Sequence, residues 1–97
     1  MKMVNIEVEI VGMVEGFEKR RFTVVEAGGT TLRELIDQLN TRSNGGLRKA
    51  LGSSIEEGRN FVQIWVNEQE VPMQEESRTL SEGDRVAFIS IPVVAGG

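Results

Sequence analysis

Two glycines, Gly96 and Gly97, close the printed sequence and suggest the clearest chemistry in the chain. Residues without side chains pass a narrow channel and adopt backbone angles forbidden to others. A free carboxylate cannot accept sulfur or an amine directly, because its leaving group would be oxide. A partner must first convert it with ATP into an acyl-adenylate. We therefore predict that Gly97 is the reacting residue and that Val94, Ala95 and Gly96 thread it into another protein's active site.

A frayed terminus made of small residues is the simpler interpretation of the same pattern. Glycine pairs also occur inside the sequence, at Gly28-Gly29 and Gly45-Gly46, so a pair alone is weak support. Position is more informative. With 11 glycines in 97 residues, composition places glycine at both final positions with a probability of about 1%.

The composition removes most catalytic chemistry from the chain itself. Its 97 residues include no cysteine and no histidine, which excludes a thiol nucleophile, a disulfide framework, cysteine-bound metal and the usual general base. The sequence also lacks the P-loop pattern of glycines with lysine and serine or threonine, so it is not expected to activate its own carboxylate. We predict a protein that is not an enzyme and binds no cofactor or metal, with ATP used by an activating partner.

Charge and hydropathy narrow the range of partners. Fifteen acidic residues against eleven basic ones give a net charge of −4, which argues against nucleic acid. No apolar run reaches the ~20 residues of a membrane helix, and Met1-Lys2-Met3-Val4 leads directly into charged positions. We expect a cytoplasmic chain with no membrane partner. The one basic run, Lys19-Arg20-Arg21, is typical of a charged strand edge and is assigned no function.

Hydrophobic periodicity predicts two strands and a helix in the first half. Val4, Ile6, Val8 and Ile10 alternate with mostly polar residues, and alternation resumes over 19–25, which indicates a hairpin. Thr31 and Glu34 have the spacing of a capping box. The helix that they begin is expected to end near Asn40, before Ser43-Asn44-Gly45-Gly46, with 40–60 an insertion-like loop containing a weak helical piece over 47–51. One apolar stripe of the helix contains Leu32, Leu35, Ile36 and Leu39.

Three further strands are predicted in the second half. Residues 61–66 alternate, 66–71 turn the chain back, and Pro72 places the returning segment at a sheet edge. Ser81-Glu82-Gly83-Asp84 is a polar turn before a last strand over 85–91, and Asp84 is expected to accept amide hydrogen bonds across it. This order favours an α+β fold of β-grasp (ubiquitin-like) type, a mixed sheet on one main helix with the first and last strands parallel at its centre. The domain would span 1–91, followed by a flexible tail over 92–97.

The C-terminal residues resemble a known family. The segment that begins Leu80-Ser81-Glu82-Gly83-Asp84 and ends Val93-Val94-Ala95-Gly96-Gly97 is similar to the signature of ubiquitin-like sulfur carriers, which include the small subunit of molybdopterin synthase and the thiamine-pathway carrier. Val66-Asn67 and Thr30-Thr31-Leu32 match more weakly. The resemblance implies that Gly97 is adenylated by an enzyme related to ubiquitin-activating enzymes and converted to a thiocarboxylate. It then donates sulfur to an acceptor held by a larger subunit or a biosynthetic enzyme.

The sequence departs from that family at several points. The tail is slightly longer than usual, Pro92 stands where the family often has paired prolines, and the outward face of the first strand carries Asn5, Glu7 and Glu9. The 40–60 loop favours the molybdopterin branch. Thiamine or sulfur amino-acid synthesis, a protein modifier forming isopeptide bonds, and a non-covalent β-grasp binding module remain alternatives.

Four side chains are candidates for a partner interface, although they can equally be covered by other parts of the chain. Phe61 and Trp65 share the strand face opposite Val62, Ile64 and Val66. By the same alternation, Val86 and Phe88 are expected in the core, whereas Ala87, Ile89 and Ile91 face outward near the tail. We predict that Ile89 and Ile91, and secondarily Phe61 and Trp65, contact a partner.

Overall fold

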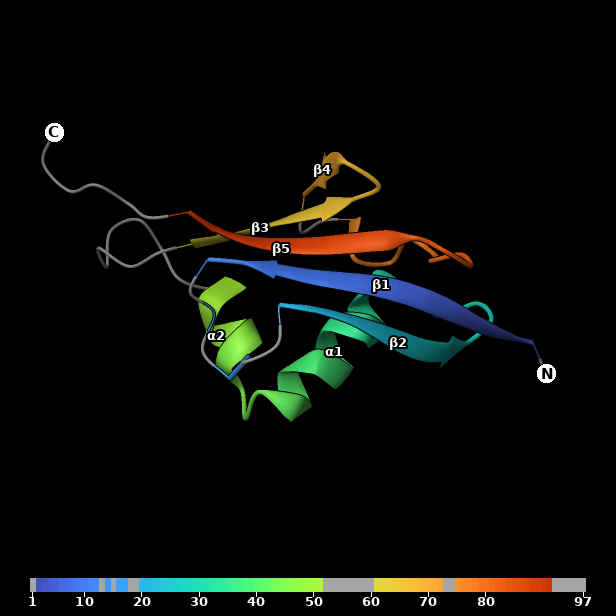
Figure 1. Cartoon of the computed structure of the whole chain (residues 1–97), viewed down its shortest axis with the longest axis horizontal. Coiled ribbons are helices and arrows are strands. Elements are labelled where there is room, and N and C mark those ends of the chain that lie inside the picture. Colours follow the sequence, from blue (N-terminus) through green and yellow to red (C-terminus); the bar gives the residue numbers. More distant parts are fainter. Residues whose placement is uncertain are drawn as a thin grey trace, which may run out of the picture.

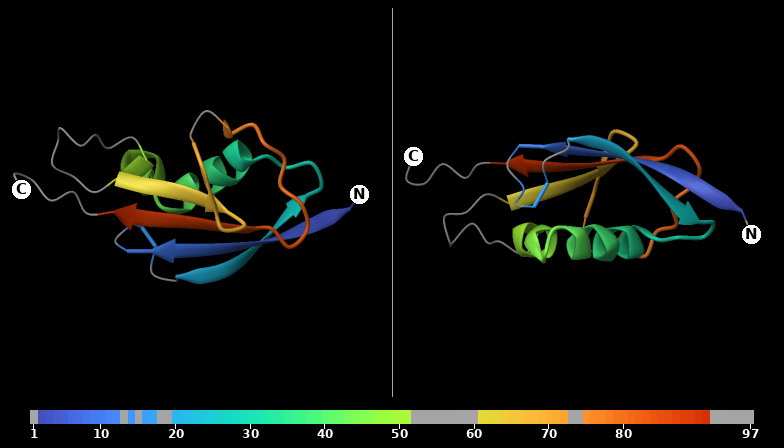
Figure 2. Two further views of the ribbon diagram at one scale, coloured as in Figure 1. Left: turned by 90° about the horizontal axis from the view of Figure 1, so that it is seen from above. Right: turned by 60° about the horizontal axis from the view of Figure 1, so that its bottom comes forward.

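The computed structural model describes residues 2–12, 14, 16–17, 20–51, 61–72 and 75–91. Five strands form one sheet in the order β2-β1-β5-β3-β4, and the helices lie end to end across one of its faces (Figures 1 and 2). The predicted β-grasp architecture is therefore confirmed. In chain order the elements are β1 (Met3–Val11), β2 (Arg21–Ala27), α1 (Leu32–Arg42), α2 (Gly46–Leu51), β3 (Phe61–Val66), β4 (Gln69–Val71) and β5 (Arg85–Ile91).

The centre of the sheet is the parallel pair of β1 and β5, as predicted. Val8 lies beside Val86 and Ile10 beside Phe88, while β2 and β3 pair antiparallel with the outer sides of the two central strands. The short strand β4, which precedes Pro72, forms one edge of the sheet. The last strand of the chain is thus hydrogen-bonded on both sides.

The core lies between the sheet and the helices. Strands β1, β3 and β5 alternate as the sequence predicted, with one set of side chains buried and the other facing out. The apolar stripe of α1 is wholly buried, with no exposed surface at any of its four residues. The buried aliphatic and aromatic side chains of the sheet include Ile6, Val8, Ile10, Ile64, Val66, Val86 and Phe88.

All four amides of the first turn of α1 have acceptors. Leu32 and Arg33 donate to the backbone oxygens of Arg78 (3.0 Å) and Glu76 (2.8 Å). Glu34 donates to Thr31 Oγ1 (3.2 Å), which confirms the predicted cap, and Leu35 donates to Thr31 O (3.1 Å). The 75–78 segment therefore caps this helix from a position far away in the sequence.

The structure corrects three predicted boundaries. The helix α1 continues to Arg42 instead of ending near Asn40, because Ser43 caps it by donating its amide to Leu39 O (3.0 Å). After a turn at 43–45, the helical piece predicted over 47–51 is confirmed as α2, which begins one residue earlier, at Gly46, and 52–60 lie outside the described residues. The strand β2 begins at Arg21 and extends to Ala27, since its pairing with β1 continues as far as Met3.

A side-chain network holds α2 in place. Arg48 donates to Asp37 of α1 (2.7 Å) and to Glu76 (2.8 Å), and its backbone amide donates to Asn40 Oδ1 (2.8 Å). The hydrogen bond to Asp37, helped by Glu76 and opposed by partial burial, raises the pKa of Arg48 above its ordinary value. The weakly predicted helix is thus stabilised by contacts with other elements.

Candidate functional site

The site predicted at the end of the chain lies largely outside the described residues. This applies to Val94, Ala95, Gly96 and Gly97, so their predicted roles stay predictions. For Phe61 and Ile91 the backbone alone is described, and the two are register partners at the end of the β3–β5 ladder. The strand that leads into 92–97 is therefore positioned by β1 and β3.

The start of β5 is held by a polar network around Asp84. One carboxylate oxygen accepts from the Ser81 amide (2.8 Å), which confirms the predicted bond across the turn. The other accepts from Asn67 Nδ2 (2.9 Å), and Asn67 Oδ1 accepts in turn from the Arg85 amide (2.9 Å). The Ser81–Asp84 motif and Asn67 thus have a structural role, joining the β3–β4 hairpin to the first residue of β5.

The same turn is also tied to β1. Glu7 donates its amide to Asp84 O, and Gly83 donates to Asn5 O, each at 2.9 Å. The Asn5 amide donates to Glu82 Oε1, also at 2.9 Å. Because the turn is held from both neighbouring strands, the register of β5 is fixed at its start, and with it the place where the chain leaves the sheet.

The outer face of the sheet brings two of the predicted interface residues together. Trp65 and Ile89 line a hollow of about 320 Å³, and both side chains are half-buried. The Trp65 indole N–H donates to Gln63 Oε1 (3.1 Å). Charged residues border the apolar centre of this hollow, which we call the outer hollow. Its lining consists of Glu9, Trp65, Glu68, Arg85, Ala87 and Ile89.

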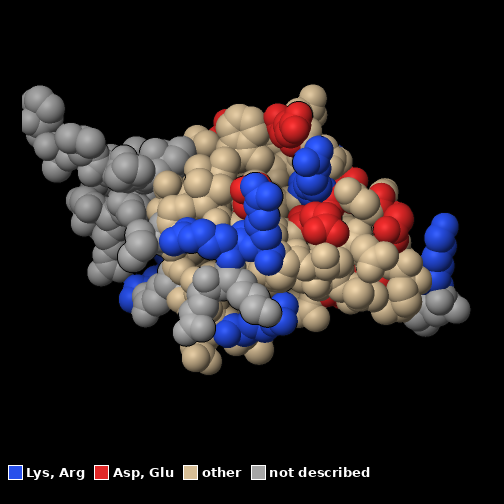
Figure 3. Space-filling view, in the orientation of Figure 1, with Lys and Arg blue, Asp and Glu red and all other residues tan. Residues whose placement is uncertain are grey.

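The other half of the outer face, over β1 and β2, has polar side chains in its middle, together with the exposed Met3, Val11 and Val25. Glu7 accepts from the Thr23 hydroxyl (3.0 Å), and Glu9 accepts from Arg21 (3.3 Å), in both cases between register partners. In Figure 3, acidic and basic side chains interleave over the middle strands, and basic ones gather toward the left, over the start of β2 and the helices. The outward polarity predicted for β1 is therefore confirmed.

Two charged residues of the outer hollow, Glu68 and Arg85, were not predicted. Glu68 follows Asn67 in the β3–β4 turn, and these two central residues have positive φ angles of 70° and 50° respectively, as in a type I′ hairpin. This conformation places Glu68 3.8 Å from Arg85. Asn67 is a residue type that favours such a turn and could have indicated it. No sequence pattern indicates that Glu68 adopts a positive φ angle. The alternation of 85, 87 and 89 was a signal for Arg85.

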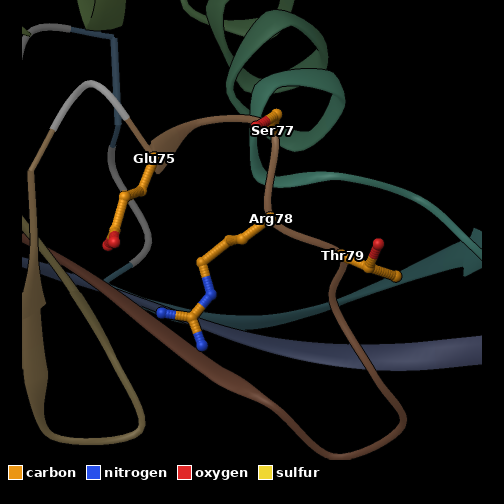
Figure 4. A pocket seen from close by; sticks show the side chains of 4 residues that line it. All are labelled: Glu75, Ser77, Arg78 and Thr79. Carbon is orange, nitrogen blue, oxygen red and sulfur yellow. The ribbon is translucent and has the colours of Figure 1, made fainter.

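A second hollow, of about 470 Å³, lies beside the start of α1 (Figure 4). Glu75, Ser77, Arg78 and Thr79 line it, and all four are exposed. Glu75 and Arg78 extend to one side of the segment, with the hydroxyls of Ser77 and Thr79 turned away from them. This hollow is distant from the end of β5, which lies at the opposite end of the sheet (Figure 2).

Neither a metal site nor a membrane span is found in the part of the chain that the structure describes. It contains no cluster of three or more acidic, histidine or cysteine residues suited to holding a metal ion. Its helices are too short and too polar to cross a bilayer.

The sheet with a parallel central pair and a helix across one face defines the ubiquitin-like class of proteins. Within that class, the chain belongs to the ThiS family, whose model matches residues 8–97. The family match covers the end of β1 (8–11), the whole of β5, the turn at 81–84 and the two final glycines. It confirms the resemblance to ubiquitin-like sulfur carriers. No curated protein matches the chain by sequence.

Solved structures share this fold at low sequence identity. The complex of subunits 1 and 2 of molybdopterin-converting factor from Helicobacter pylori contains a chain that is 23% identical, with a TM-score of 0.61 over 97% of this chain and 100% of that one. SAMP1 from Haloferax volcanii is 19% identical, with a TM-score of 0.64 over 96% and 99%. A designed protein based on ubiquitin is 15% identical, with a TM-score of 0.54 over 98% and 96%.

Proposed function

We propose that the chain is a non-catalytic sulfur carrier whose C-terminal Gly97 is adenylated and thiocarboxylated by a partner enzyme and then donates sulfur in molybdopterin biosynthesis. The observation that carries this proposal is the match of the ThiS family model up to Gly97, on a chain with no cysteine or histidine. Since the sulfur is bound to the chain's own carboxyl carbon, the carrier needs no thiol.

In the proposed reaction, the carboxylate of Gly97 is the one group that this chain supplies. The Gly97 carboxylate attacks the α-phosphorus of ATP, forming an acyl-adenylate and releasing pyrophosphate. A sulfur donor of the persulfide or sulfide class then attacks the carbonyl carbon and displaces AMP; a persulfide additionally requires a thiol to reduce the resulting acyl disulfide. The product is a thiocarboxylate in which one oxygen has been replaced by sulfur.

The outer hollow supports docking to a second protein. Trp65, Ala87 and Ile89 form its apolar centre, and the carboxylates of Glu9 and Glu68 lie at its border. An apolar side chain with basic neighbours is the complementary surface. The similar chain from Helicobacter pylori is in a complex of two subunits of molybdopterin-converting factor, which favours a sulfur-acceptor subunit as one partner and the molybdopterin branch as the pathway. The adenylating enzyme is the other partner.

The test is reaction of the full chain with its cognate adenylating enzyme, Mg-ATP and a persulfide donor. The expected product has an intact mass increased by the exchange of one oxygen for one sulfur. A variant lacking Gly97 and a reaction without ATP are the negative controls. The product, mixed with the acceptor subunit and a pterin precursor, should return to its original mass as sulfur is transferred.

Two results would contradict the proposal. An unchanged mass with every plausible cognate adenylating enzyme would exclude the carrier role. Stable isopeptide bonds between Gly97 and lysines of other proteins, without any thiocarboxylate, would instead identify a protein modifier.

A further inference from the structure

The strand β2 forms the second edge of the sheet, and in the described part of the chain it pairs with β1 alone. A strand at an edge has backbone donors and acceptors on its outer side that no neighbour uses. The opposite edge, β4, has three residues, whereas β2 has seven. Within the described ranges, the longer edge therefore presents more backbone groups without a partner in the sheet.

The register identifies the groups that point outward. Ile10 donates its amide to Arg20 O (2.7 Å), and Gly28 donates to Lys2 O (2.8 Å), at the two ends of the β1–β2 ladder. In an antiparallel pair, hydrogen-bonded and non-bonded residue pairs alternate. Counting from either end, Val24 bonds to β1, whereas Thr23 and Val25 direct their N–H and C=O groups away from it. The outward groups thus lie in the middle of the edge.

A groove runs beside those groups. It has a volume of about 490 Å³ and lies between β2 and the second half of α1. Val25 is 54% exposed, the highest exposed fraction among the large hydrophobic residues described. An extended chain laid along the edge would cover Val25 and fill the groove with every second side chain. The groove is lined by Thr23, Val24, Val25, Gln38, Thr41 and Arg42.

Positive charge surrounds the start of this edge. Among the described residues of the groove lining, Arg42 is the charged one, and its guanidinium lies 5.6 Å from the centre of the Phe22 ring. On the outer face, the Arg21 side chain is 82% exposed and donates to Glu9 at 3.3 Å. The exposed Arg20 precedes them. Arg20 and Arg21 belong to the basic run Lys19-Arg20-Arg21, to which no function was assigned.

We infer that the β2 edge, together with the groove beside α1, binds an extended acidic segment of a partner protein as an additional strand. Backbone bonds to Thr23 and Val25 hold the segment, β-branched side chains cover Val25, and acidic residues lie beside Arg21 and Arg42. A second copy of this chain fits less well, because two paired β2 edges would bring their arginines into one interface. This surface is separate from the outer hollow and from Gly97.

The probes are two capped ten-residue peptides of alternating valine and threonine. One has three glutamates at its N-terminal end, and the other has them at its C-terminal end. Each is titrated into the ¹⁵N-labelled full chain, and amide signals and hydrogen exchange are followed by NMR. We expect one of the peptides to shift the signals of Thr23 and Val25 and to slow their exchange. The exchange of the Val24 amide, which already donates to β1, should change little and serves as the internal control.

Two variants test the two parts of the surface. Val25→Pro removes an outward donor without removing a bond to β1, and should weaken binding about tenfold. The double variant Arg21→Glu and Arg42→Glu should weaken it at least about tenfold, and more in dilute salt. Arg78→Glu, the charge change of one of these two substitutions at an exposed residue near the start of α1, is the control and should bind like the unchanged protein.

Several outcomes would overturn the inference. These are the absence of shifts with both peptides, shifts centred on Trp65 and Ile89, or equal binding of a peptide with lysines in place of the glutamates. A concentration-dependent dimer that Val25→Pro abolishes would identify the edge as a contact between copies of this chain. Each result is independent of Gly97 chemistry, so the sulfur-carrier proposal and this one fail separately.

Discussion

The two faces of β5 differ in what they contribute. Its inner side chains, Val86 and Phe88, have 1% and 0% of their surface exposed and pack against the helices. Its outer side chains, Ala87 and Ile89, border a hollow open to solvent. Because successive residues of a strand point to opposite faces, one seven-residue segment supports both the core and a candidate docking surface. A substitution on the inner face is therefore expected to lower stability, whereas one at the next position, on the outer face, is expected to weaken binding.

The largest expected effect is on the inner face. Phe88→Ala should lower the free energy of unfolding by about 3–5 kcal/mol, because it leaves a cavity at a fully buried ring. Urea unfolding followed by circular dichroism measures the change. Should Phe88→Ala fail to fold, Phe88→Leu is expected to cost less than about 2 kcal/mol. A loss under about 1 kcal/mol for Phe88→Ala would show that the ring is not part of a close-packed core.

The outer face should respond in binding. Ile89→Asp is expected to weaken association with the sulfur-acceptor subunit by at least about 30-fold, while lowering the free energy of unfolding by only about 1 kcal/mol. Isothermal titration calorimetry and urea unfolding separate the two effects. Met3→Asp, a change at an outer-face residue that is 51% exposed, is the matched control. Equal affinities of the two variants would place the docking surface elsewhere.

The turn that fixes β5 should have an intermediate effect. Asp84→Ala removes the acceptor of the Ser81 amide and of Asn67 Nδ2, and should lower the free energy of unfolding by about 1–3 kcal/mol. Ser81→Ala, in the same turn, keeps the backbone amide and is expected to change stability by less than about 0.5 kcal/mol. If both variants unfold at the same urea concentration, the Asp84 network does not stabilise the turn.

The smallest effect has the opposite sign. Glu68→Gly should raise the free energy of unfolding by about 1 kcal/mol, because glycine adopts the positive φ angle without steric cost. It should also weaken partner binding slightly by removing a carboxylate from the outer hollow. Thermal unfolding gives the first effect and calorimetry the second. Glu70→Gly, in the adjoining strand, should destabilise instead; a loss of stability in both variants would disprove strain at Glu68.

The spacing of residues along the sequence predicted those parts of the fold that are formed by residues close together in the chain. The alternation in β1 and β5, the apolar stripe of α1 and the Asp84–Ser81 bond are encoded within a few residues of one another. The residues that line the outer hollow were only partly predictable. Trp65 and Ile89 follow from alternation, whereas the position of Glu68 depends on a backbone conformation that glutamate rarely adopts.

Contacts between distant segments were not predicted. The helix α2 is held by Arg48, whose partner Glu76 is 28 residues away, and Asn67 reaches Asp84 across 17 residues. No local pattern links such pairs. The basic run was predicted to be a charged strand edge, but the groove beside that edge was not predicted, because it depends on how α1 packs next to β2.

The parallel pairing of β1 and β5 also bears on how the molecule responds to force. A partner that pulls on the chain beyond Ile91, while the start of β1 is held, draws the two strands in opposite directions along their common axis. The hydrogen bonds between them are then loaded together, not opened one after another as in a peeled hairpin. The antiparallel ladder with β3 lies on the other side of β5 and shares the load. A protein machine that pulls this domain by its C-terminal end would therefore meet its greatest mechanical resistance at the first step.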